Sequence, residues 1–270
     1  MTQISLTQIL DQMAPDGARL MEPLPQSWLQ GRTAFGGLTS ALLLEATRRA
    51  HPGLPPLRSV LVNFTAPVGG APSFATQVLR QGRNITTITC DALDGDKVLA
   101  RATFTFGGDI PDSPTHDLPP PNHVAPDAAP DAFGRNSPFR PPAFLENFEL
   151  RFLDGAPPFS GAKRGMLRGW TRHRAEDARR GIVPFLCLAD VLPPAGMIKR
   201  TGPVVNSSVT WICNILRPEV ETEDGWYHVE MDLSAEHQGY SSQVMRIWDR
   251  EGRLVSDGMQ SVVIFPLPPR

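Results

Sequence analysis

Alternating apolar and polar positions recur in the same order in the two halves of the chain. Residues 58–67 alternate like a β-strand and end in a proline, and residues 209–218 do the same. Aligning the two prolines gives an offset of 151 residues (218 − 67), which keeps apolar positions on apolar positions. In each half a second strand and a hairpin with a Gly turn follow, at 74–83 and 86–106 and again at 227–240 and 242–265.

Each half also has one predicted helix ahead of its strands. Residues 38–50 lack Gly and Pro and are largely strong helix formers, whereas residues 184–192 are shorter and nearly all apolar. A helix that is apolar on most sides is enclosed by other elements. We therefore predict an α+β fold of two tandem units, in each of which an antiparallel β-sheet wraps around a helix. This is a double hotdog, with one continuous sheet assembly, and a generic duplicated α+β protein is the alternative.

Prolines mark the boundary between the halves. Residues 111–142 hold ten of the 28 prolines and show no apolar periodicity. Proline cannot donate a backbone hydrogen bond and favours extended chain. We expect an N-terminal unit at 1–110, a proline-rich linker at 111–142 that tethers the units outside both cores, and a C-terminal unit at 143–270.

Composition narrows the partners and the compartment. The hydrophobic content is 41%, the charged content 20% and the formal net charge −2. A protein of this composition folds in water and has no overall basic field to attract nucleic acid or an anionic membrane. No apolar stretch is long enough to span a membrane, and the first 20 residues include two Asp and lack the apolar segment of a secretory signal. We expect a cytoplasmic protein without nucleic-acid or membrane partners.

Three polar residues of the second half stand where the first half is apolar. Gln260 aligns with Phe104 at an offset of 156 (254 − 98, from the hairpins), and Ser208 aligns with Leu57 at 151. Asp190 lies in the second helix, although the matching stretch of the first helix has no carboxylate. Burying a carboxylate among apolar residues is costly without hydrogen bonds. Taken singly, Asp190 and Gln260 could face solvent and Ser208 could be an ordinary strand residue, but together they predict one site per chain.

Other kinds of site have less support. The six histidines form no metal-ligand spacing, and no G-x-S-x-G nucleophile motif or phosphate-binding loop occurs. The three cysteines each lie in an apolar run, which predicts buried, unpaired thiols. We expect neither a metal nor a cofactor.

The chain resembles the acyl-CoA thioesterase II (TesB-like) family of double-hotdog enzymes. The resemblance rests on Phe35-Gly36-Gly37 at the first helix, Ala189-Asp190 in the second, the strand 208–218, and the last hairpin, which leads to Gln260. It covers most of the chain and is weakest across the proline linker.

The family orients a water molecule with an Asp, a Thr and a Gln. The resemblance implies that Asp190 and Gln260 are two of these residues, and that Ser208 replaces the Thr if the strand is aligned on Arg217-Pro218. Alignment on the Trp of this strand would instead put Val205 there. The acidic residue that follows the Gln in the family is a serine here.

The resemblance implies hydrolysis of acyl-CoA thioesters by water. Asp190 would act as general base, with Gln260 and Ser208 positioning the water. Backbone N–H groups at Phe35-Gly36-Gly37 would bind the substrate and its oxyanion, because the first N–H groups of a helix are free and lie at its positive end. A non-catalytic acyl-CoA-binding protein, or a hydratase-type hotdog acting on enoyl-CoA, are the alternatives. We also expect a homo-oligomer, since exposed sheet edges attract partners.

Overall fold

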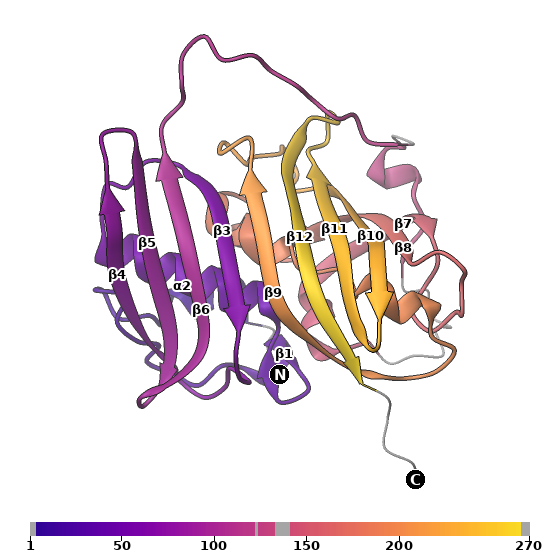
Figure 1. The fold of residues 1–270 in the computed structure, drawn as a ribbon, viewed down its shortest axis with the longest axis horizontal. Coiled ribbons are helices and arrows are strands. Elements are labelled where there is room, and N and C mark those ends of the chain that lie inside the picture. The colour runs from indigo at the N-terminus through magenta and orange to yellow at the C-terminus, as the bar shows by residue number, and fades with distance from the viewer. Residues whose placement is uncertain (1–3, 122–123, 133–140, 266–270) are drawn as a thin grey trace.

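One antiparallel sheet of ten strands runs through the whole molecule, in the order β4-β5-β6-β3-β9-β12-β11-β10-β8-β7 (Figure 1). The computed structural model describes residues 4–121, 124–132 and 141–265. The strands of the first half are β3 (Leu57–Phe64), β4 (Ser73–Gln81), β5 (Ile85–Asp94) and β6 (Lys97–Gly107). Those of the second are β7 (Phe148–Gly155), β8 (Met166–His173), β9 (Val205–Ile215), β10 (Tyr227–His237), β11 (Tyr240–Trp248) and β12 (Leu254–Phe265).

The two halves meet at β3 and β9 about a local two-fold axis. Leu61 of β3 pairs with Ile212 of β9, and these two residues are equivalent under the offset of 151. A β-bulge at Arg58 in β3 recurs at the equivalent Val209 in β9. The duplication predicted from the apolar pattern is therefore confirmed down to the position of a bulge.

Helix α2 (Gly36–Ala50) lies against one face of the sheet in the first half, where it packs on β4, β5 and β6 and meets α3 (Ile182–Leu188) of the second half (Figure 1). Most of its residues are buried, as the apolar sequence predicts. This is the double-hotdog architecture expected from the sequence.

The three cysteines are buried and unpaired, as predicted. The remaining elements are short: α1 (Leu6–Asp11), β1 (Leu29–Gln30), β2 (Thr33–Ala34) and 3₁₀ turns at Gln26–Trp28, Pro126–Ala128, Ala143–Asn147, Glu176–Ala178 and Ala195–Lys199.

The second helix differs from its prediction. The sequence pattern predicts it at 184–192, but it begins at Ile182 and ends at Leu188. Pro193 and Pro194 follow shortly after, and a proline disfavours helical backbone in the residue before it. The helix ends at Leu188, before the residue that Pro193 restricts, and Asp190 lies in the turn beyond its end rather than within it.

Described parts of the proline-rich segment pack on the second half instead of standing clear of it. The Trp248 Nε1–H donates to the Leu118 carbonyl at 2.6 Å, and the Trp170 Nε1–H donates to the Val124 carbonyl at 2.8 Å. Ala129 is buried beside Trp170. This segment connects β6 to β7 along the chain, and Figure 1 shows it passing over one end of the sheet. The division of the chain at 111–142 stays a prediction, as does the homo-oligomer expected from the sheet edges β4 and β7.

Candidate active site

Asp190 of the second half reaches the first turn of helix α2, which belongs to the first half. Its carboxylate accepts a hydrogen bond from the Gly37 backbone N–H. The close approach depends on glycine, because a Cβ at Gly36 would lie 2.3 Å from Asp190 Oδ2. A Cβ at Gly37 would lie 2.0 Å from the carbonyl oxygen of Cys187 in α3. The two glycines therefore allow one half to hold the carboxylate of the other.

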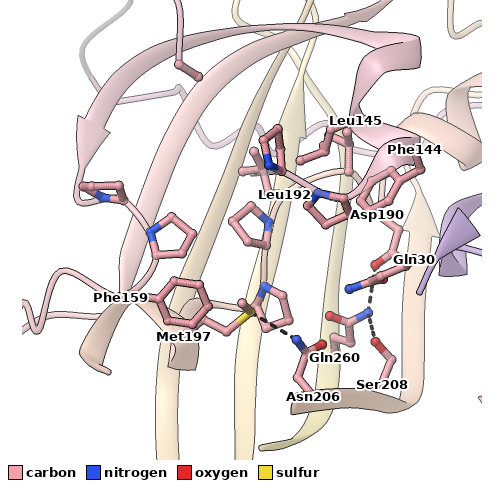
Figure 2. A pocket seen from close by; sticks show the side chains of 18 residues that line it. Gln30, Phe144, Leu145, Phe159, Asp190, Leu192, Met197, Asn206, Ser208 and Gln260 are labelled. Atoms are coloured by element: carbon pink, nitrogen blue, oxygen red, sulfur yellow. Dashed lines mark hydrogen bonds between the residues drawn. The ribbon is translucent and has the colours of Figure 1, made fainter. Parts of the chain in front are cut away.

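Gln260 joins the predicted residues together. It lies on β12, it is 2% exposed, and its Nε2 donates to Asp190 Oδ1 at 2.8 Å and to Ser208 Oγ at 3.2 Å (Figure 2). Asp190, Ser208 and Gln260 thus form one cluster, brought together from a turn and two neighbouring strands. Val205, the alternative to Ser208, is the first residue of β9 and is 51% exposed, outside this cluster.

A fourth polar residue fixes the direction of the Gln260 amide. Gln243 on β11 is fully buried, and its Nε2 donates to Gln260 Oε1 at 2.7 Å. Gln243 Oε1 in turn accepts from the Ala195 N–H at 2.7 Å. Because the carbonyl end of Gln260 is occupied by a donor, its NH₂ end must face Asp190 and Ser208.

Burial raises the pKa of Asp190 to about 7, against the opposite effect of its hydrogen bonds from Gln260 and from the Gly37 N–H. A carboxylate with a pKa near neutrality can both take a proton and release it at physiological pH, which suits a general base. The Gly37 N–H is engaged by this carboxylate, which narrows the set of backbone donors available to a substrate oxyanion.

The equivalent place in the first half holds packing residues. Phe104 pairs with Val60 just as Gln260 pairs with Trp211, so the register confirms that Phe104 and Gln260 are equivalent. Phe104 is fully buried and Leu57, the counterpart of Ser208, is 3% exposed. The polar cluster is therefore formed once in the described chain.

The cluster opens into a cavity of about 150 Å³ (Figure 2). Its polar lining consists of the three clustered residues together with Gln30 and Asn206. Six prolines line it: Pro141, Pro142, Pro157, Pro158, Pro193 and Pro194. The other apolar walls come mainly from Phe144, Leu145, Phe159, Val191, Leu192 and Met197. Phe35, expected to contact the substrate, is buried behind this wall and stacks on Phe144 with ring centroids 4.3 Å apart.

Two functional candidates escaped the sequence reasoning. Gln243 carried a usable signal, because the strand pairing aligns it with the fully buried Ile88, the same exchange of apolar for polar that marked Gln260. Gln30 carried none, since it lies on the two-residue strand β1. Its side-chain amide lines the cavity and makes no hydrogen bond to another described residue.

Comparisons with known proteins agree with this fold and identify its family. A family model described as the acyl-CoA thioesterase N-terminal domain matches residues 24–107, and one described as the acyl-CoA thioesterase C-terminal domain matches residues 119–264. Among curated proteins, no relative matches the chain.

Several solved structures share the fold at low sequence identity. A conserved protein of unknown function with a hot dog fold from Alicyclobacillus acidocaldarius is 20% identical with a TM-score of 0.86, and all of both chains is covered. A putative thioesterase II from Thermobifida fusca is 18% identical with a TM-score of 0.78, covering 98% of this chain and 99% of that one. A tesB protein from Mycobacterium avium subs paratuberculosis is 18% identical with a TM-score of 0.75, covering 98% of each chain.

Within the described residues, no helix is both long and apolar enough to cross a membrane. The cytoplasmic location stays a prediction from the sequence.

Two matched domain models span most of the chain, and thioesterase II structures share its fold over nearly its full length. The chain therefore belongs to the acyl-CoA thioesterase family of double-hotdog proteins, as its resemblance to the thioesterase II (TesB-like) enzymes predicted.

Proposed function

We propose that this protein hydrolyses acyl-CoA thioesters to the free acid and CoA, using a water molecule held by Asp190, Ser208 and Gln260. The observation that carries the proposal is the Gln260 amide, which donates to both Asp190 and Ser208 at the inner wall of an apolar cavity. The cavity would take the acyl chain and the cluster would face its carbonyl carbon.

The reaction needs a base, a positioned nucleophile and a place for negative charge. Asp190 takes a proton from the water as the water oxygen bonds to the thioester carbonyl carbon. Gln260 and Ser208 fix the position of that water. The tetrahedral intermediate then expels the CoA sulfur as the C–S bond breaks, and the proton held by Asp190 passes to the thiolate. The products are a carboxylic acid and CoA-SH.

The oxyanion of the intermediate requires hydrogen-bond donors that the ground state leaves unused. Because the Gly37 N–H is engaged by Asp190, we assign this role to the Gly36 N–H at the positive end of α2 and to the side-chain amide of Gln30. Both come from the first half of the chain. The first half would therefore supply oxyanion donors, and the second half would supply the base.

The test is release of free thiol from a panel of acyl-CoA substrates by the purified protein, measured with a thiol reagent. We expect CoA-SH release by the wild type and its loss in Asp190→Asn. Binding of acyl-CoA without thiol release would show a non-catalytic acyl-CoA binder instead. A change in enoyl-CoA absorbance without thiol release would show a hydratase.

A further inference from the structure

The volume of the cavity limits the acyl group it can hold. At about 150 Å³ it matches a protein cavity that takes up one benzene molecule. A group of about six carbons fills such a space, whereas a long fatty chain exceeds it several-fold. The number of carbons that fit therefore depends on whether the walls can move apart.

Three pairs of adjacent prolines make the walls stiff. Pro141-Pro142, Pro157-Pro158 and Pro193-Pro194 come from three separate segments and all line the cavity. A proline fixes its own φ, and the first member of each pair is further restricted by the second. Phe144, which also lines the cavity, is 5% exposed and stacked on the buried Phe35. These walls have few alternative conformations through which the cavity could expand.

Leu192 belongs to the wall that this cavity shares with a second one. This second, smaller cavity of about 30 Å³ adjoins the first and shares Ala132, Pro157, Pro158, Leu192 and Pro193 with it. Leu192 has the largest flexible side chain of these five. The Leu192 side chain is 7% exposed. A chain too long for the first cavity would have to displace this side chain to reach the second.

The lining also selects by polarity. Its polar groups are the catalytic cluster, Gln30 and Asn206, and the described lining residues include no Lys, Arg or His. Prolines present no N–H donor to the cavity. A carboxylate at the far end of an acyl chain would therefore be buried without a counter-charge, in the same cavity as Asp190.

We infer that the substrate is the CoA thioester of a compact, apolar acyl group, about six carbons long or built on one aromatic ring. This inference rests on the proposed function and specifies its substrate class. Hexanoyl-CoA and phenylacetyl-CoA represent the class, while palmitoyl-CoA and succinyl-CoA lie outside it in length and in polarity.

The first test is kcat/KM for thiol release from butanoyl-, hexanoyl-, phenylacetyl-, palmitoyl- and succinyl-CoA with the wild-type protein. We expect hexanoyl- or phenylacetyl-CoA to be best, with palmitoyl- and succinyl-CoA lower by at least about tenfold. Palmitoyl-CoA hydrolysed as fast as hexanoyl-CoA would overturn the inference and leave the proposed function intact. Failure to release thiol from every substrate would instead refute the proposed function itself.

The second test removes the Leu192 side chain from the shared wall. Leu192→Ala should join the two cavities and raise kcat/KM for dodecanoyl-CoA relative to hexanoyl-CoA by about tenfold. Leu186→Ala is the matched control, because Leu186 is buried in α3 and does not line the cavity. If Leu192→Ala does not fold, Met197→Ala enlarges the same cavity from another segment. An unchanged chain-length profile in the folded variant would contradict the assignment of the wall.

Discussion

Replacement of Asp190 by Asn separates the proposed chemistry from a structural role. The change keeps the size of the side chain and removes its ability to take a proton. A positioned general base contributes about 10²–10⁴-fold to a rate, so we expect turnover on acyl-CoA to fall by that factor. The structure also fixes what should happen to stability.

Two effects on stability oppose each other in this variant. Burial raises the pKa of Asp190 from 3.8 to about 7, and each pKa unit corresponds to about 1.4 kcal/mol, so the ionised carboxylate destabilises the fold by up to about 4 kcal/mol. Solvent in the cavity reduces this value, because Asp190 is only partly buried. Removal of the ionised carboxylate in Asp190→Asn therefore raises stability. The loss of a hydrogen bond lowers it, because Asn keeps only one side-chain oxygen whereas the carboxylate accepts from both Gln260 and Gly37, and an unpaired buried donor costs about 1–3 kcal/mol.

The net change in the free energy of unfolding should therefore lie within about 2 kcal/mol at neutral or higher pH. Turnover, a denaturant melt and acyl-CoA affinity are measured on the same preparation. Loss of turnover with folding and substrate binding preserved is the expected result. Near-normal turnover in the folded variant would refute Asp190 as the base, and a large loss of stability would show a structural carboxylate.

Four further outcomes follow from the same geometry. The folded-state pKa of Asp190 lies above its ordinary value, so its contribution to stability should be greatest below about pH 4 and be lost as pH rises through about 7. Turnover should show the opposite trend, with kcat rising as pH approaches 7 and Asp190 ionises. A kcat that does not change with pH through 7 would argue against an ionising base. Gly36→Ala should lower kcat by pushing the carboxylate away, with little change in melting temperature, and full activity would show that the close contact can relax without loss. Gln243→Leu should lower kcat less than Gln260→Ala, because it leaves the Gln260 amide in place but free to turn. If Gln243→Leu lowers stability as much as Gln260→Ala does but leaves kcat unchanged, Gln243 does not position the Gln260 amide. Phe104→Ala should destabilise the protein by about 3–5 kcal/mol while the folded fraction keeps its turnover, and a stable but inactive variant would place a second site in the first half.

Much of the fold could be predicted because duplication gives the sequence an internal reference. Alignment of Pro67 with Pro218 matches the apolar positions of the two copies of this strand, and a slip by one residue would put every side chain on the other face of the sheet. The pairing of β3 with β9 itself was not predicted. The same comparison found Gln260 and Ser208, since a polar residue stands out where its equivalent is a packing residue. Contacts between the halves had no such reference, and the hydrogen bond from Gly37 to Asp190 is one of them.

The cavity walls were also outside the reach of sequence patterns. Pro141 and Pro142 were assigned to a linker, because adjacent prolines cannot form regular structure. The structure places both on the wall of the cavity. Local preferences predicted the extended backbone of these residues correctly, but the surface against which that backbone lies is set by tertiary packing.

The support that α2 gives to Asp190 has a consequence for how the two halves of the chain can diverge. The first half has packing residues at the positions of the polar cluster, yet its glycines at the start of α2 hold the carboxylate of the second half. Selection on activity would therefore act on the first half through backbone shape, at Gly36 and Gly37, and on the second through side-chain chemistry, at Asp190 and Gln260. Neither half would form a working site if produced alone. Deletion of either copy would therefore abolish the site instead of restoring a smaller, single-unit enzyme.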